Sequence, residues 1–196
     1  MSTAHANAGP IALGYLPLCD AAPPIVAEAL GFYRDAGLDV RLSREPSWAN
    51  IRDKLAYGVL DAAQLLAPMA VAAQTPEIGE LALLAALNHG GAGVVLSPAA
   101  LSGGRPLTLA TVHPQSIHSF LLHAYLAEQG LAIGKDVHIV VAPPSRMIDD
   151  LRAGRLDGYC AGAPWPEAAA VDGLGVVVDE SGRRWPSAPD KLLVAT

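Results

Sequence analysis

The sequence predicts an α/β protein built from two similar lobes, and three observations support this. Short apolar runs typical of buried strands alternate with helix-like segments along most of the chain. A block of sequence recurs 96 positions later, at 60–68 and again at 156–164. Between the two copies, the stretch PAALSGGRP has the composition of a linker.

The repeated block is LDAAQLLAP in its first copy and LDGYCAGAP in its second. Together with the five residues before it, each copy reads L-x-x-G-x-L-D and ends in A-P, and a helix-like stretch precedes each. Two copies are too few for a solenoid, so they indicate one supersecondary unit used once in each lobe. The identical positions are Leu55, Gly58, Leu60, Asp61, Ala67 and Pro68 in the first copy, and Leu151, Gly154, Leu156, Asp157, Ala163 and Pro164 in the second.

The first lobe is predicted over residues 1–91, and the second, with the crossing strand and the linker, over residues 92–196. Lobe 1 is expected to have strands at 11–18, 38–45 and 60–66 and helices at 23–37 and 47–58. Lobe 2 is expected to have strands at LTLATV, VHIVVAPP, LDGYCAG, GLGVVVD and KLLVAT, with helices over 116–130, 145–154 and from Trp165 onward. Open α/β sheets bind ligands at the carboxyl ends of their strands, so two such edges across a linker predict a binding cleft.

The composition excludes several classes of protein. The chain has 196 residues, of which 52% are hydrophobic and 16% charged, as in a globular protein. Its net charge of −6 argues against direct binding of nucleic acid, and any anion site must be built locally. Cys19 and Cys160 are the only cysteines, which excludes a disulfide scaffold and a four-cysteine zinc site. A disulfide between these two stays open.

The amino-terminal MSTAHANAGP lacks the basic and apolar regions of a signal peptide, and no run of 18 apolar residues is present. The sequence as written therefore predicts a cytoplasmic protein with no transmembrane segment. A periplasmic location is the alternative if a leader has been removed.

A helix expected to begin after Ser116 provides the sharpest candidate site. Ser116 is a plausible N-cap, and His118 would follow at the second helical position. Free backbone N–H groups and the positive end of the helix dipole point outward there, so a small anion could bind beside His118. The alternative is a solvated or capping histidine.

Trp48 and Lys191 are two further candidates. Trp48 falls in the first turn of another helix, where it could form an apolar wall with one N–H donor or simply pack in the core. Lys191 opens the last predicted strand, where a desolvated ammonium would attract an anion, although a surface lysine is the alternative. No catalytic motif and no metal-ligand spacing occurs, so we expect no enzyme, no metal and no cofactor.

The sequence from Gly14 to Met69 closely resembles the amino-terminal lobe of the nitrate- and bicarbonate-binding proteins of ABC transporters. The stretch S-R-E-x-S-W-A-N-I-R-D-K, then G-x-L-D-A-A and L-A-P-M, carries the resemblance, which continues through A-P-P-S-R-M, L-D-G-Y-C and P-W. The P-P-x-R-M stretch looks most like the cytoplasmic nitrate/nitrite sensors of this family, which release an RNA-binding antiterminator when the anion binds.

The resemblance implies the two-lobed periplasmic-binding-protein type II architecture and a non-catalytic receptor for nitrate or nitrite, with bicarbonate as a further anion. It implies Trp48, His118 and Lys191 as ligand contacts, and an antiterminator or an ABC permease as partner. Two positions depart from the family: Gly91 replaces an amide residue beside the ligand, and Ala163 replaces an acidic one. The family also continues with helices that pack back onto lobe 1, so we expect apolar surface exposed on lobe 1.

Two other functions stay open. The same architecture resembles thiamin-pyrimidine and menaquinone-pathway proteins, and Gly91 and Ala163 would leave room for a larger organic ligand. A pocket of several hundred Å³ lined by apolar groups would favour that function over an anion receptor. The third function is a degenerate module that binds a partner but no ligand.

Overall fold

The computed structural model describes residues 9–73, 80–103 and 106–196, and the chain divides into two compact units. Unit 1 comprises the described residues up to Leu65, Ala70–Leu87 and Lys191–Thr196, and unit 2 comprises Leu66–Met69 and Asn88–Asp190. Most of the stretch considered for a leader, and two residues of the predicted linker, lie outside the described residues. None of the helices in the described ranges is long and apolar enough to cross a membrane.

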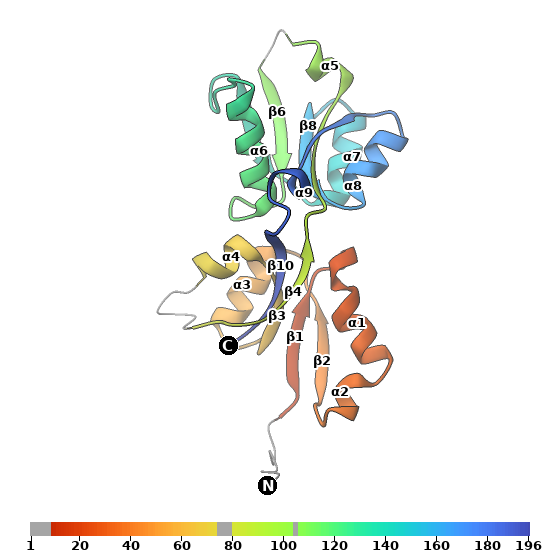
Figure 1. Cartoon of the computed structure of the whole chain (residues 1–196), viewed down its shortest axis with the longest axis vertical. Coiled ribbons are helices and arrows are strands. Elements are labelled where there is room, and N and C mark those ends of the chain that lie inside the picture. Colours follow the sequence, from red (N-terminus) through yellow and green to blue (C-terminus); the bar gives the residue numbers. More distant parts are fainter. Residues whose placement is uncertain (1–8, 74–79, 104–105) are drawn as a thin grey trace. The chain divides into compact units, whose positions relative to one another are not determined.

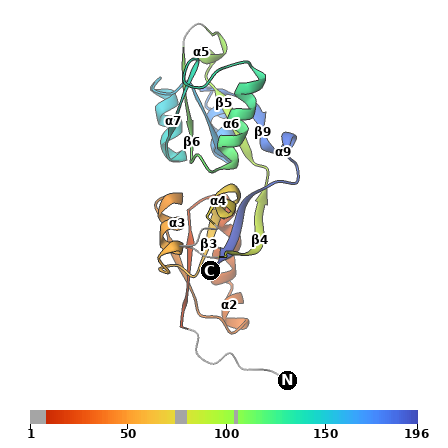
Figure 2. The same cartoon turned by 90° about the vertical axis from the view of Figure 1, so that its left-hand side faces the viewer.

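Unit 1 is built on a five-stranded sheet with the order β2-β1-β3-β10-β4, in which β1 runs parallel to β2 and to β3. Helices α1 and α2 lie on one side of the sheet, and α3 and α4 lie on the other (Figure 1, Figure 2). The elements are β1 (Ile11–Tyr15), η1 (Cys19–Ala21), α1 (Ala22–Ala29), α2 (Phe32–Asp35), β2 (Val40–Arg44), α3 (Trp48–Ala56), β3 (Ala62–Leu66), α4 (Ala67–Ala72), β4 (Ala82–His89) and β10 (Pro189–Ala195).

The position of β10 corrects the sequence-based assignment. The strand KLLVAT was predicted in lobe 2, but β10 lies in the first sheet, between β3 and β4. Strand order depends on pairing between distant segments, and an apolar run does not show which sheet it joins. The consequence is that Lys191 belongs to unit 1. The lobe boundary after residue 91 stays a prediction.

Unit 2 has a mixed sheet with the order β7-β6-β8-β5-β9. Strand β6 runs parallel to β7 and β8, whereas β5 runs antiparallel to β8 and β9. Helix α6 lies on one side of the sheet, with α7 and α8 on the other (Figure 1). The elements are β5 (Ala92–Leu96), α5 (Pro98–Leu101), β6 (Leu107–Thr111), α6 (Ile117–Glu128), β7 (Val137–Val141), α7 (Pro144–Arg152), β8 (Gly158–Gly162), α8 (Trp165–Val171), β9 (Val176–Glu180) and α9 (Ser181–Arg184).

The apolar face of α6 organises the core of unit 2. Leu121, Leu122 and Leu126 are almost fully buried and pack with the apolar residues of β5 and β6. Burial of one such side chain stabilises the fold by roughly 1.5–3 kcal/mol, so this helix is held firmly against the sheet. Its amino-terminal residues are therefore fixed in position as well.

The internal repeat performs the same structural task twice. Asp61 accepts a hydrogen bond from the backbone N–H of Ala12 and returns its own N–H to the carbonyl of Ala12, at 2.8 and 2.9 Å. Asp157 makes the same pair of bonds with Thr108, at 2.8 and 2.8 Å. Each aspartate thus joins the start of its own strand to the second residue of the neighbouring parallel strand.

The glycines of the repeat have matching roles at the ends of helices. Gly58 follows α3 with φ of 64°, and Gly154 follows α7 with φ of 68°. This left-handed conformation ends a helix at little cost only when the residue is glycine. The repeat therefore marks two equivalent helix-to-strand connections.

Candidate functional site

A chain of buried polar groups crosses unit 1 at the carboxyl end of β1. The backbone N–H of Leu16 donates to Oε1 of Gln64 at 2.9 Å, and Nε2 of Gln64 donates to Oδ1 of Asp20 at 2.6 Å. Nζ of Lys191 lies 3.0 Å from Oδ2 of the same carboxylate. The groups come from the end of β1, from η1, from β3 and from β10, so four distant segments meet at this edge of the sheet.

Local structure explains how Asp20 reaches this network. After β1 the chain turns, and the N–H of Ala21 donates to the carbonyl of Leu18 at 3.0 Å, which begins η1. Asp20 lies in the first turn of this short helix, where a carboxylate is favoured by the free N–H groups. The turn directs Asp20 toward Gln64 and Lys191.

Lys191 is buried, with 2% of its surface exposed, so it is not a surface lysine. Its ammonium carries a positive charge into a chain of net charge −6 and is held there by Asp20. A buried lysine needs a paired carboxylate or a bound anion to remain charged. Asp20 meets this need in the structure, and a role of Lys191 in ligand binding stays a prediction.

Trp48 is the first residue of α3, as the sequence predicted, and it is 4% exposed. Ser47 is the N-cap of this helix, and its side chain accepts a hydrogen bond from the N–H of Asn50 at 3.1 Å. The indole is therefore part of the core of unit 1. Its predicted contact with a ligand stays a prediction.

In unit 2, the amino end of α6 has the predicted cap. Ser116 is fully buried, and its Oγ accepts a hydrogen bond from the N–H of Ser119 at 3.0 Å. The same hydroxyl donates to the carbonyl of His113 at 2.5 Å, which orders the loop before the helix. The cap satisfies one of the first N–H groups of α6, and the amino end of a helix is a place that favours an anion.

His118 is buried in the first turn of α6, with 2% of its surface exposed. Its Nε2 lies 3.8 Å from Oδ2 of Asp190, and that carboxylate lies 3.5 Å from Nδ2 of Asn88. The imidazole is thus not a solvated histidine, because it lies against a carboxylate in a buried setting. An imidazole N–H in this position could donate a hydrogen bond to an oxygen of a ligand.

A hydroxyl at the end of β6 adds a feature that the sequence did not indicate. Thr111 is 1% exposed, and its Oγ1 has no hydrogen-bond partner among the described residues. A buried hydroxyl without a partner costs roughly 1–3 kcal/mol, so such groups are uncommon in folded proteins. Thr111 belongs to the strand that leads into α6, which makes its hydroxyl a candidate ligand donor.

Gly91 follows β4 and has φ of 81°, a conformation that favours glycine. A Cβ at this position would meet nothing within 4 Å, so the backbone rather than crowding accounts for the glycine. Its carbonyl accepts a hydrogen bond from the N–H of Ala163 at 2.8 Å, which connects the two positions that were expected to depart from the family pattern. Its predicted place in a ligand site stays a prediction.

The structure divides the five predicted site residues between the two units. Trp48 and Lys191 belong to unit 1, and Gly91, Ser116 and His118 belong to unit 2. Sequence reasoning missed Asp20, Gln64, Asp190 and Thr111. For two of them, position was the one available indication: Thr111 lies at the carboxyl end of β6, and Asp20 lies just beyond the carboxyl end of β1. Among the described residues, no group of three or more His, Cys, Asp or Glu side chains could hold a metal ion.

Two α/β units with mixed five-stranded sheets define the class of two-lobed solute-binding proteins with the periplasmic-binding-protein type II fold. The structure matches the crystal structure of the periplasmic nitrate-binding protein NrtA from Synechocystis PCC 6803 with a TM-score of 0.81, at 28% identity, over 95% of this chain and 55% of that one. The chain belongs to the NMT1-like family, whose model matches residues 4–196.

Relatives in Synechocystis sp. indicate the branch of this family. The bicarbonate transport ATP-binding protein CmpC is 36% identical over 92% of this chain and 30% of its own length. The nitrate/nitrite binding protein NrtA is 30% identical over 91% of this chain and 46% of its own length. The chain thus spans less than half the length of these two relatives and is related to the nitrate and bicarbonate branch of solute-binding proteins.

Proposed function

We propose that the chain is a non-catalytic receptor for a small oxyanion, with nitrate or nitrite as the first candidates and bicarbonate as the next. The amino end of α6 carries the proposal. There, the buried His118 lies two positions beyond a capped helix start. The helix dipole favours a negative charge at this end, and His118 adds a side-chain N–H donor.

The buried lysine of unit 1 supports the same proposal. A protein with a net charge of −6 needs local positive charge to attract an anion, and Lys191 is a buried cation that we propose for this role. Asp20 and Gln64 hold the lysine region in place through hydrogen bonds and an ion pair. The relatives NrtA and CmpC are a nitrate/nitrite binding protein and a bicarbonate transport ATP-binding protein, which fits a planar oxyanion.

The physiological role is proposed on resemblance. The P-P-S-R-M stretch favours a cytoplasmic nitrate/nitrite sensor that holds an antiterminator, and a receptor for an ABC transporter is the alternative. Either role requires that the anion bind one state of the protein more tightly than another. A pull-down of the antiterminator with and without nitrate separates the two, because only the sensor changes its binding.

Anion binding is tested by thermal unfolding with nitrate, nitrite, bicarbonate and chloride at matched ionic strength. A ligand at about 100 times its Kd adds roughly 2.7 kcal/mol to stability, which raises the Tm by a few degrees. His118→Gln should abolish the shift measured against its own unliganded Tm. His123→Gln, on the exposed part of the same helix, should retain it. Absence of any shift at millimolar nitrate, nitrite and bicarbonate would overturn the proposal.

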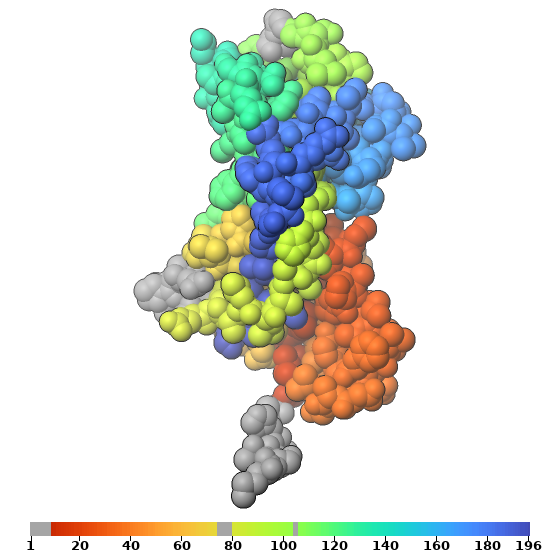
Figure 3. All heavy atoms as spheres, in the orientation of Figure 1, coloured from red at the N-terminus to blue at the C-terminus, as the bar shows by residue number. Residues whose placement is uncertain are grey.

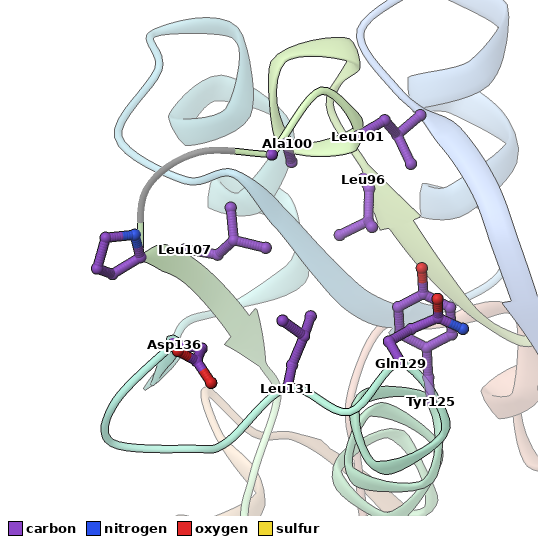
Figure 4. Close-up of a pocket in the computed structure, with 10 residues that line it drawn as sticks. Leu96, Ala100, Leu101, Leu107, Tyr125, Gln129, Leu131 and Asp136 are labelled. Carbon is purple, nitrogen blue, oxygen red and sulfur yellow. The ribbon is translucent and has the colours of Figure 1, made fainter.

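An organic ligand is a second candidate, favoured by one observation in unit 2. A pocket of about 510 Å³ is lined mainly by apolar residues, with Tyr125, Gln129 and Asp136 as its polar members. Figure 4 shows Leu96, Leu107 and Leu131 converging on this pocket below α5. The pocket is lined by Leu107, the first residue of β6, whereas His118 lies in α6, which follows the carboxyl end of β6. The two sites are therefore distinct. A thermal shift with a hydroxymethylpyrimidine that Leu131→Trp removes would support it.

A further inference from the structure

The indole N–H of Trp165 is a buried donor in unit 2. Trp165 is the first residue of α8, and its Nε1 atom is shielded from solvent and has no hydrogen-bond acceptor among the described residues. A buried N–H without an acceptor is uncommon in folded proteins, because burial removes its bond to water without replacing it. An indole N–H can only donate, so the group that would satisfy it must be an acceptor.

Hydrogen bonds hold the start of α8 at the carboxyl end of β8. The hydroxyl of Tyr159, a fully buried residue of β8, donates to the carbonyl of Trp165 at 2.7 Å. Between the strand and the helix, the N–H of Ala163 donates to the carbonyl of Gly91 at 2.8 Å. The other end of α8 reaches the surface, since Val171 is 87% exposed, and Figure 3 shows the blue segment that contains α8 at the surface of unit 2. Trp165 is thus fixed at the edge of the sheet.

The strand order brings this edge close to residues of the proposed anion site. Strand β8 has β6 on one side and β5 on the other. Thr111, the last residue of β6, is aligned with Cys160 of β8, and Gly91 directly precedes β5. The hydroxyl of Thr111 is also buried and has no partner among the described residues. Two buried donors, one from Thr111 and one from Trp165, therefore follow the carboxyl ends of neighbouring parallel strands.

We propose that Trp165 is a further ligand-binding residue of the anion site and donates its indole N–H to the bound oxyanion. This inference rests on the proposed function, because it adds a donor for the same ligand to the hydroxyl of Thr111 and the imidazole of His118. The several oxygen atoms of nitrate, nitrite or bicarbonate supply enough acceptors for these donors. The indole adds a hydrogen bond without adding a charge, and its apolar ring keeps water from the anion.

A ¹⁵N–¹H NMR titration tests the hydrogen bond directly, because each of the three tryptophans gives its own indole N–H signal. The probes are nitrate, nitrite and bicarbonate, each added to a separate sample of the wild type. We expect the Trp165 signal to shift with the same midpoint as the rise in Tm. The signal of Trp185, which packs against the core of unit 2, should stay in place.

An affinity measurement provides an independent readout. Trp165→Phe keeps an aromatic ring but removes the N–H, so calorimetric titration should show a Kd about tenfold higher for the anion that binds the wild type. Trp185→Phe is the matched control, because Trp185 is also partly buried in unit 2, and this variant should bind like the wild type. If Trp165→Phe does not fold, Trp48→Phe and Trp185→Phe assign the Trp165 signal by elimination, and the NMR titration decides.

The outcomes separate this inference from the proposed function. If an anion binds the wild type but the Trp165 signal stays in place, or Trp165→Phe binds as tightly as the wild type, this inference is overturned and the proposed function stands. If nitrate, nitrite and bicarbonate all fail to bind the wild type, the proposed function is overturned, and this inference with it.

Discussion

The ammonium of Lys191 lies 3.0 Å from the carboxylate of Asp20, and the two side chains expose only 3% and 8% of their surface. Removing one partner of a buried ion pair leaves an uncompensated charge, which costs about 3–5 kcal/mol. Lys191→Met should therefore lower the free energy of unfolding in urea by this amount. Lys135→Met, at an exposed lysine, should change it by less than about 0.5 kcal/mol.

The double variant Asp20→Asn with Lys191→Met distinguishes the charge from the packing. Since neither charge is then buried alone, we expect the double variant to recover part of the loss caused by Lys191→Met. Strictly additive losses in the double-mutant cycle would contradict the assignment of Lys191 and Asp20 as an ion pair.

The two aspartates of the repeat make the same hydrogen bonds in different surroundings, which allows a matched comparison. Asp157 is 4% exposed, whereas Asp61 is exposed. Asp157→Ala leaves the N–H of Thr108 without its acceptor in a drier setting, so we expect a loss of about 2–3 kcal/mol. Asp61→Ala should cost under about 1 kcal/mol, because water can replace the carboxylate. Equal losses by urea unfolding would show that burial does not govern this connection.

The repeat also shows what the sequence could predict. Its spacing identified two equivalent units, and the helix ends at Gly58 and Gly154 followed from a local rule about left-handed glycine. The cap at Ser116 and the helix start at Trp48 were local features of the same kind, and the structure confirms both positions. Local rules work where a few neighbouring residues decide the conformation.

Long-range pairing set the limit of prediction. The sheet that receives β10 depends on contacts between residue 191 and segments more than a hundred positions away, so its assignment to lobe 2 was wrong. Asp20 was missed because it lies in a short turn with no periodic pattern, and its partners Gln64 and Lys191 come from distant strands. A single aspartate after a strand is too common a pattern to mark a buried ion pair.

Thr111 offers a test that separates structural from ligand-binding roles. Because Oγ1 is buried and has no partner among the described residues, Thr111→Val should raise the stability of the unliganded protein by about 1 kcal/mol. If the hydroxyl binds the anion, the same variant should bind nitrate about tenfold more weakly. Thr108→Val, at a partly exposed position of the same strand, should have neither effect. If Thr111→Val were less stable than the wild type, the assignment of Oγ1 as a hydroxyl without a partner among the described residues would be contradicted.

Tyr159 should make the stability of unit 2 sensitive to alkaline pH. Its hydroxyl donates to the carbonyl of Trp165 at 2.7 Å. Burial, and next the carboxylate of Glu167, raise the pKa of this phenol above its usual value of about 10. The unfolded chain then loses the proton first, so stability is complete below about pH 10 and falls as the pH rises toward the folded pKa, by up to about 1.4 kcal/mol per pH unit.

Tyr159→Phe removes this phenol, so the variant should lose stability less steeply above about pH 10, although it gives up about 1 kcal/mol at neutral pH with the hydrogen bond. Tyr57→Phe is the control, because the side chain of Tyr57 is 82% exposed and is not buried in the fold. Tyr33 and Tyr125, whose pKa values burial also raises, remain in both variants and leave a residual slope. Urea unfolding from pH 7 to about 11 measures the difference, and parallel curves for Tyr159→Phe and the wild type would refute it.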